Sequence, residues 1–212
     1  MIINKVESFV FKDYKAKAFV GKLNLFGNKS KIFPHEETQI ENNITYSILK
    51  NHPIVLGAKI TEKNKSIELE GNLIILDGHH RFEYILKNEV DEVFDVIFVD
   101  YEDIEVSSHK SIINCSIEEL NNFVSNNYVL NKGMKGNYFY EINDENFYLN
   151  DIKSISELYN LKKVLQEKNL ITPISNNINK QNCISFTPIP KKVIFSKSIF
   201  PYKSTWITPR FN

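Results

Sequence analysis

The stretch that decides the fold is residues 73–86, Leu-Ile-Ile-Leu-Asp-Gly-His-His-Arg-Phe-Glu-Tyr-Ile-Leu. Its first four residues form an unbroken apolar run, which is short enough for a buried strand. Asp77-Gly78 then interrupts the pattern, as a tight turn from a strand into a helix requires. After the turn, apolar residues recur with the spacing of one helix face, at Phe82, Ile85 and Leu86.

The junction between this strand and this helix is a candidate anion site. The first N–H groups of a helix have no partners within the helix, and the helix dipole points its positive end at the same place. Gly78, His79, His80 and Arg81 add a glycine turn and basic side chains there. Phosphate is the anion that we expect. The alternative interpretation is an ordinary turn whose polar side chains are solvated.

Composition limits the classes of function. The 212 residues can form one domain or two small ones, and 26 basic residues balance 26 acidic residues. This balance argues against a dedicated nucleic-acid binder, whose affinity depends on neutralising phosphates. No apolar stretch approaches the roughly 18 residues of a membrane span. The N-terminus lacks the features of a signal peptide, and Cys115 and Cys183 are typical of thiols in a reducing cytoplasm, although spacing alone leaves a disulfide open.

A second stretch, Pro34-His35-Glu36-Glu37, precedes apolar residues with helical spacing between Ile40 and Leu49. His52-Pro53 ends that pattern, because the residue before proline avoids the helical region. The sequence therefore predicts a helix that begins near the two glutamates. Acidic residues are favourable in the first turn of a helix, so on this interpretation Glu36 and Glu37 simply start the helix.

Asp77 to Arg81, after a hydrophobic strand, resembles the signature of the ParB/sulfiredoxin-like superfamily, specifically its free serine kinase branch. Sulfiredoxins carry Gly-Cys-His-Arg at the corresponding place and the chromosome-partitioning ParB proteins carry Gly-Glu-Arg-Arg, whereas this chain has Gly78-His79-His80-Arg81. The resemblance implies an α/β fold with a ParB-like nucleotide-binding lobe, residues 1–110. It also implies a smaller α+β lobe, residues 111–212, with a cleft between the two.

The same resemblance implies roles for individual residues. In the serine kinases a Pro-His-Glu at this distance before the signature supplies the catalytic glutamate, which matches Glu36. Gly78, His79, His80 and Arg81 would hold phosphates, and Asp77 and His79 would take part in catalysis. The phosphoryl donor would be ATP or ADP. Mg²⁺ would arrive with the nucleotide, held mostly by phosphate oxygens, with Asp77 as a nearby carboxylate.

The C-terminal segment is apolar and marked by prolines, which predicts that it packs against the protein. It resembles the closing segment of the serine kinases, a Pro-x-Lys-[Ser/Thr]-Thr stretch that Lys203, Ser204 and Thr205 match. The kinases continue with Arg-His, whereas Trp206-Ile207 follow here, so an arginine that could pair with a substrate carboxylate or phosphate is absent. Arg210 is a nearby candidate to replace it.

Three further patterns lie in the second half of the chain. Ser108 and His109 fall near the strand that lines the amino-acid pocket in the family, although a histidine at a strand end is most simply a surface residue. Ser116 with Glu119 forms a capping box for a helix through about Asn126, and a second helix is expected over 154–168. The aromatic clusters at 138–140 and 147–148 lack interleaved basic residues, which favours core packing over base stacking.

The resemblance implies a kinase that moves a nucleotide's phosphoryl group to the hydroxyl of a free amino acid, with L-serine as the preferred acceptor. Its partners would be a nucleotide and a small hydroxyl-bearing metabolite, without nucleic acid or membrane. The alternative is a ParB-like regulatory or DNA-associated module that binds a nucleotide without transferring phosphate. A DNA-associated protein would add a helix-turn-helix and a basic surface, and the sequence indicates neither.

Overall fold

The computed structural model describes residues 1–10, 16–38, 44–132, 136–174, 182–196 and 198–208. By its internal contacts the chain divides into two compact units. Unit 1 comprises Met1–Glu105, Lys191–Ile199 and Ile207–Asn212, and unit 2 comprises Val106–Pro190 and Phe200–Trp206. The predicted lobes, 1–110 and 111–212, differ from these units mainly at the C-terminal segment, parts of which return to unit 1.

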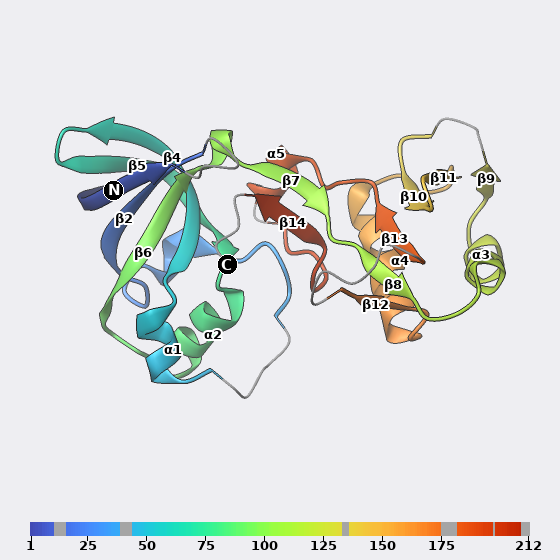
Figure 1. Ribbon diagram of the computed structural model, residues 1–212, viewed down its shortest axis with the longest axis horizontal. Helices are drawn as coiled ribbons and strands as arrows, with labels where there is room; N and C mark the ends of the chain where they lie inside the picture. Colours follow the sequence, from blue (N-terminus) through green and yellow to red (C-terminus); the bar gives the residue numbers. More distant parts are fainter. Residues whose placement is uncertain (11–15, 39–43, 133–135, 175–181, 197, 209–212) are drawn as a thin grey trace. The chain divides into compact units, whose positions relative to one another are not determined.

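Unit 1 is built on a six-stranded sheet in the order β1-β2-β6-β4-β5-β3 (Figure 1). The strands are β1 (Ile2–Val10), β2 (Lys17–Asn24), β3 (Ile32–Phe33), β4 (Ile54–Lys63), β5 (Ser66–Asp77) and β6 (Val93–Asp100). Strand β1 also pairs with β5, so five strands close into a ring and β3 pairs with the far part of β5. A closed ring leaves fewer unpaired strand edges than an open sheet. The pairs β4–β6 and β3–β5 are parallel, and the others are antiparallel.

Short helices complete unit 1. They are α1 (Tyr46–Asn51), α2 (His79–Lys87) and α5 (Lys191–Ile194), with 3₁₀ turns at Lys29–Lys31 and Tyr101–Asp103. Helices α1 and α2 lie together at one end of the closed ring of strands in Figure 1.

The core of unit 1 confirms the predicted strand, turn and helix. Residues 73–75 of β5 are almost fully buried, and α2 adds Phe82 and Ile85, which are 3% and 1% exposed. Burying a side chain such as Phe82 contributes about 1.5–3 kcal/mol, which docks α2 on the sheet. Strand β5 is longer than predicted, because Gly71 adopts a positive φ of 73° and lets the strand run through an irregularity in its pairing with β4.

Unit 2 contains a second six-stranded sheet, in the order β12-β8-β13-β10-β11-β9, with antiparallel pairs throughout. Its strands are β8 (Ser111–Ile113), β9 (Leu130–Lys132), β10 (Phe139–Ile142), β11 (Glu145–Leu149), β12 (Ile171–Pro173) and β13 (Cys183–Phe186). Its helices are α3 (Ile117–Ser125) and α4 (Ile155–Glu167). A separate two-stranded sheet joins β7 (Glu105–Ser108) and β14 (Thr205–Thr208).

Both helices predicted in unit 2 are present. The Ser116 hydroxyl accepts the Glu119 N–H at 3.1 Å, which confirms the cap of α3. The apolar face of α4 is buried as predicted, except that Val164 is 39% exposed. Core packing of the aromatic clusters is confirmed for Tyr140, which is fully buried and stacks on Phe147 with ring centroids 5.1 Å apart.

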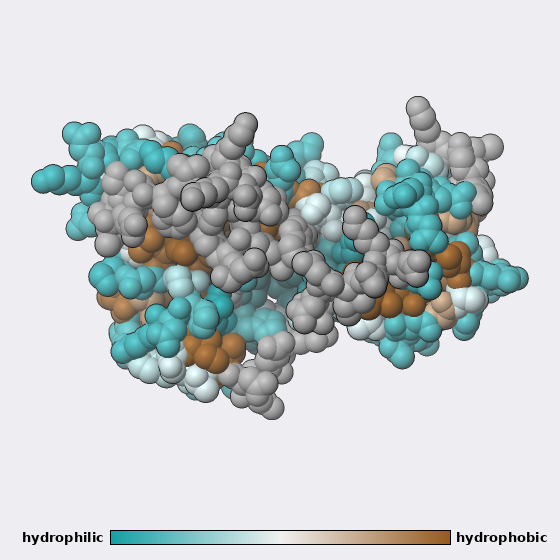
Figure 2. Space-filling model, viewed as in Figure 1, coloured by the Kyte–Doolittle hydropathy of each residue, from teal (hydrophilic) through white to brown (hydrophobic). Residues whose placement is uncertain are grey.

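Hydrophilic residues cover much of the described surface on the face shown in Figure 2, and the hydrophobic residues there form separate small groups. Among the described residues, no helix has the length and apolar character needed to cross a membrane.

Candidate functional site

Gly78 forms the turn between β5 and α2, and only glycine fits there. Its φ is +98°, a left-handed conformation that residues with a Cβ rarely adopt. A Cβ at this position would lie 2.9 Å from Ile54 Cγ1 and 2.9 Å from Arg81 Nη2. The glycine therefore lets the start of the helix approach both the β4 strand and the arginine.

The first turn of α2 has an unusual distribution of charge. It contains no acidic residue, and its N-cap residue, Gly78, has no side chain that could cap the helix. His79, His80 and Arg81 occupy the turn instead, although the positive end of a helix dipole favours negative groups. An anion from outside the chain would satisfy both the N–H groups and the dipole.

Arg81 is held in place on one side of its guanidinium. Its Nη2 donates to Asp77 Oδ2 at 2.7 Å and to the Pro53 carbonyl at 3.4 Å. Its Nε is buried and has no hydrogen-bond partner among the described residues, and the Arg81 side chain is 17% exposed. A buried donor without an acceptor costs about 1–3 kcal/mol, so an oxygen ligand at this nitrogen would be favourable.

His79 has a buried Nε2, which likewise has no hydrogen-bond partner in the part of the chain that the structure describes. Burial and, next, the neighbouring His35 lower the pKa of His79 to about 3. At neutral pH this imidazole is therefore uncharged. A neutral ring supplies no positive charge to an anion, and the ring is neutral because an imidazole removed from water holds a proton poorly. His79 can still hydrogen-bond a ligand as a neutral group.

The stretch around Pro34-His35-Glu36 lies beside this turn. Strand β3 pairs in parallel with the end of β5, with Ile32 opposite Leu73 and Phe33 opposite Ile74. This pairing carries the chain past Ile75, whose carbonyl accepts a hydrogen bond from His35 Nδ1 at 2.7 Å. The His35 and His79 rings meet edge to face, with centroids 4.6 Å apart.

The predicted helix start at Glu36 and Glu37 is wrong. The described helix, α1, begins at Tyr46, and residues 39–43 of the predicted helix lie outside the described residues. Pairing with β5 keeps the chain extended up to the glutamates, so tertiary contacts override the local pattern. Glu36 is 12% exposed, with Oε1 at 3.3 Å from His35 Nε2, whereas Glu37 is exposed.

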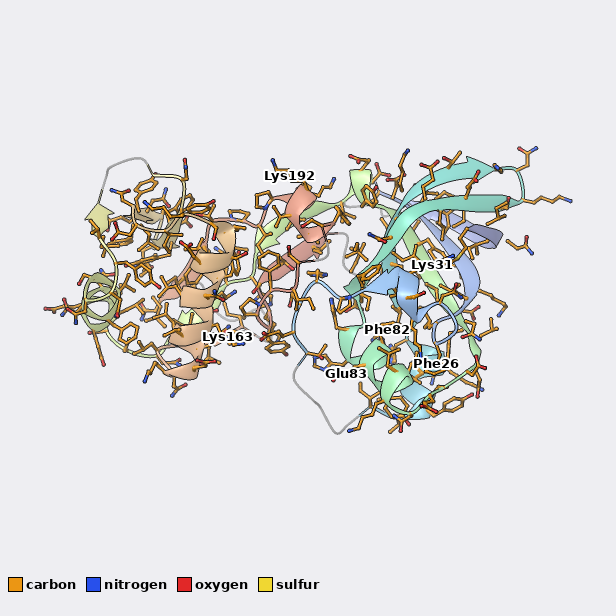
Figure 3. All side chains as sticks on the ribbon, turned by 180° about the vertical axis from the view of Figure 1, so that it is seen from behind. Phe26, Lys31, Phe82, Glu83, Lys163 and Lys192 are labelled. Atoms are coloured by element: carbon orange, nitrogen blue, oxygen red, sulfur yellow. The ribbon has the colours of Figure 1, made fainter. Side chains whose placement is uncertain are left out.

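A second contact ties this segment to α2. The Thr38 hydroxyl hydrogen-bonds the carboxylate of Glu83. Figure 3 labels Glu83 and its neighbour Phe82, which leave the helix on different sides. Phe82 faces the core, so α2 is anchored on one side and meets the 34–38 segment on another.

The residues predicted to bind substrate lie in unit 2, where two of them, His109 and Ser204, bond to each other. The Ser108 hydroxyl accepts the Phe186 N–H at 3.0 Å, and the His109 N–H donates to the Ser204 carbonyl at 3.1 Å. Ser204 and Thr205 are buried. His109 is 3% exposed, so its interpretation as a surface residue is wrong. A role of these residues and of Lys203 in substrate binding stays a prediction, and Arg210 lies outside the described residues.

Lys162 of α4 is a buried charged residue that the sequence analysis did not single out. It is fully buried, and its Nζ donates to the carbonyls of His109 at 3.0 Å and Lys203 at 2.7 Å. The lysine thus fastens the C-terminal segment to the chain around residue 109. The sequence contains a signal for this burial, because Lys162 lies one turn from Leu158 and Tyr159 on the apolar face of α4.

Two observations concern metal binding and thiols. Within the described part of the chain, no group of three or more His, Cys, Asp or Glu side chains could hold a metal ion. A metal at the α2 turn would therefore need most of its ligands from a bound molecule. The second observation is that Cys115 and Cys183 are both free thiols.

Comparison with known proteins shows the fold. No protein-family model matches the chain, and no curated protein matches its sequence. Among solved structures, the chain is similar to SbnI with a C-terminal truncation from Staphylococcus aureus, with a TM-score of 0.58 and 13% identity over 91% of this chain and 84% of that one. It is similar to a Glu-to-Gln mutant of free serine kinase in complex with AMP, with a TM-score of 0.55 and 12% identity over 99% of this chain and 91% of that one. It is also similar to a conserved hypothetical protein from Pyrococcus furiosus, with a TM-score of 0.55 and 14% identity over 99% of this chain and 94% of that one.

These likenesses confirm the predicted fold class, a mixed α/β fold that the chain shares with SbnI and free serine kinase. Other free serine kinase structures with this fold are complexes with AMP or ADP.

Proposed function

We propose that this protein is a nucleotide-dependent kinase that transfers a phosphoryl group to the hydroxyl of a free amino acid or a related metabolite, with L-serine as the first acceptor to test. The observation that carries the proposal is the meeting of His35-Glu36 with the first turn of α2, two segments some forty residues apart in the sequence. A carboxylate beside an anion site is the arrangement that phosphoryl transfer to an alcohol requires.

Each residue of this site has a proposed task. The N–H groups that follow Gly78 and the Nε of Arg81 bind phosphate oxygens, and neutral His79 adds a hydrogen bond. His80 lies in the same turn and contributes to phosphate binding at its edge. Glu36 takes the proton of the acceptor hydroxyl as the oxygen forms its bond to phosphorus. The bond from phosphorus to the nucleotide oxygen breaks, and the electron pair stays on the nucleotide.

Asp77 is the carboxylate that would hold Mg²⁺, with the remaining ligands supplied by phosphate oxygens and water. Its side chain is 49% exposed and its partner is Arg81, so it remains open to solvent at the turn. The ion would neutralise part of the phosphate charge. One carboxylate fits this ion because the usual nucleotide-bound Mg²⁺ needs few protein ligands.

The test is to incubate the full chain with Mg²⁺, with ATP or ADP, and with L-serine or a pool of hydroxyl-bearing metabolites, and to record ³¹P spectra. The proposal predicts a new phosphomonoester signal that requires both the nucleotide and the hydroxyl compound. Tight nucleotide binding with no phosphoester from any donor and acceptor would instead identify a nucleotide-binding module without transfer.

A further inference from the structure

The buried ring of His35 is fixed in one orientation by a backbone carbonyl. Its side chain is 2% exposed, and Nδ1 lies 2.7 Å from the Ile75 oxygen. A carbonyl oxygen can only accept a hydrogen bond, so Nδ1 carries a proton. The orientation of the ring therefore sends Nε2 toward Glu36.

The contact between His35 Nε2 and Glu36 Oε1, at 3.3 Å, needs a second proton. A ring with its only proton on Nδ1 presents a lone pair at Nε2, and a carboxylate oxygen also presents lone pairs. Two acceptors would repel each other at this distance. A proton on Nε2 converts the repulsion into a charge-assisted hydrogen bond and pairs a poorly exposed carboxylate.

Only one of the two neighbouring rings, His35 and His79, can carry this charge. The ring centroids are 4.6 Å apart, so two imidazolium ions would repel each other strongly. The carboxylate of Glu36 lies against His35, with Oε1 at 3.3 Å from Nε2, whereas His79 Nε2 has no hydrogen-bond partner among the described residues. The charge is therefore better placed on His35, beside the carboxylate, than on His79.

We propose that His35 is the positioning residue of Glu36: it is held as an imidazolium that donates Nδ1–H to the Ile75 carbonyl and Nε2–H to Glu36. This inference rests on the proposed function. His35 fixes the rotation of the carboxylate and cancels its charge beside the phosphates. During transfer the acceptor's proton goes to Glu36, and the protons of His35 are not consumed.

Two amide substitutions separate the two hydrogen bonds of the ring. His35→Asn keeps a donor in the place of Nδ1 and removes the one that faces Glu36. His35→Gln keeps a neutral donor in the place of Nε2. A base displaced by about 1 Å loses about 10²-fold in rate, so we expect His35→Asn to lower kcat by that factor with the KM for nucleotide nearly unchanged. His35→Gln should restore part of kcat.

The pH profile separates positioning by a charge from positioning by a neutral contact. In both variants the acid limb of kcat should move to higher pH, because no imidazolium then favours the ionised carboxylate. Thr38→Val is the matched control, since it removes the hydrogen bond from the same segment to Glu83 and leaves the His35–Glu36 contact alone. It should leave both kcat and the pH profile close to those of the parent.

A spectroscopic test does not depend on phosphoryl transfer. With ¹⁵N-labelled histidine at pH 7, the His35 signals, assigned by their loss in His35→Asn, should show both ring nitrogens protonated. In Glu36→Gln the Nε2 signal should move to the position of an unprotonated nitrogen. An unprotonated Nε2 in the parent protein, or a signal that Glu36→Gln does not move, would overturn the proposal.

Kinetic equality of His35→Asn with the parent protein would overturn it as well. If the parent transfers no phosphate to any hydroxyl compound, the proposed function fails, and the nitrogen signals still decide whether His35 and Glu36 form the charged pair. If His35→Asn does not fold, His35→Gln and the spectra of the parent and Glu36→Gln supply the decision.

Discussion

At the scale of single residues, the site depends on groups whose surroundings change their chemistry. Arg81 keeps its charge but uses only one side of the guanidinium for Asp77, which leaves its buried Nε for a ligand. His79, two residues away, has lost its charge through burial. Positive charge for an anion therefore comes from Arg81 and from the helix end rather than from this imidazole.

Arg81→Ala should weaken nucleotide binding by about 1.5–3 kcal/mol, the contribution of a charge-assisted hydrogen bond. Calorimetric titration of AMP or ADP measures this change. Lys87→Ala is the matched control, because Lys87 lies in the last turn of the same helix. Equal affinity in the parent and Arg81→Ala would remove the arginine from the site.

The surroundings of some of these residues could be predicted from the sequence, and those of others could not. Asp77 to Arg81 could be predicted, because the apolar run, the glycine and the helical spacing are local signals. The surroundings of Glu36 could not, because its position depends on pairing between β3 and β5, and the apolar residues that follow it have helical spacing. Lys162 was missed because a single lysine on an amphipathic helix is usually solvated.

At the scale of elements, the turn from β5 into α2 is the most constrained part of unit 1. Gly78 combines a positive φ with close contacts to Ile54 and Arg81. Gly71 in the same strand also has a positive φ, but a Cβ there would meet no atom of the described residues within 4 Å. The two glycines therefore share backbone strain and differ in crowding.

Substituting alanine at each glycine separates these two effects. Gly71→Ala should cost about 1 kcal/mol of folding free energy, from strain alone. Gly78→Ala should cost more, and it should also weaken nucleotide binding, because the new methyl group displaces the arginine or the helix start. Urea unfolding and nucleotide titration of both variants provide the comparison. Equal losses at both positions would show that crowding at the turn has no consequence.

At the scale of the whole molecule, the closed sheet of unit 1 and the return of C-terminal segments to both units are long-range features. The sequence predicted that the apolar C-terminal segment packs, and the burial of Phe200 and Ile207, 2% and 3% exposed, confirms it. Which unit each part joins could not be predicted, because no local pattern encodes a partner far along the chain.

The neutral state of His79 predicts a loss of stability in acid. Its pKa is about 3 in the folded chain and 6.5 is its ordinary value, so between these two pH values only the unfolded chain binds this proton. Its contribution is fully present above pH 6.5 and is lost as the pH falls toward 3, with a slope of up to about 1.4 kcal/mol per pH unit.

Urea unfolding between pH 7.5 and 4 measures this loss, and the difference between parent and variant isolates it from the carboxylates. His79→Phe should show a shallower fall in stability than the parent, while His52→Asn, at an exposed histidine, should follow the parent. Parallel curves for His79→Phe and the parent would mean that His79 takes up its proton as readily in the folded chain as in the unfolded one.

The central claim is that Glu36 removes the proton of an acceptor hydroxyl beside phosphates bound at α2. Its most direct test is the turnover of Glu36→Gln against Glu37→Gln, two isosteric changes at adjacent residues. Removing a general base lowers kcat by about 10²–10⁴-fold, so we expect that loss in Glu36→Gln, with nucleotide affinity nearly unchanged. Glu37→Gln should turn over like the parent, because its side chain is exposed. Normal turnover by Glu36→Gln would contradict the claim, and a loss confined to Glu37→Gln would move the base by one residue.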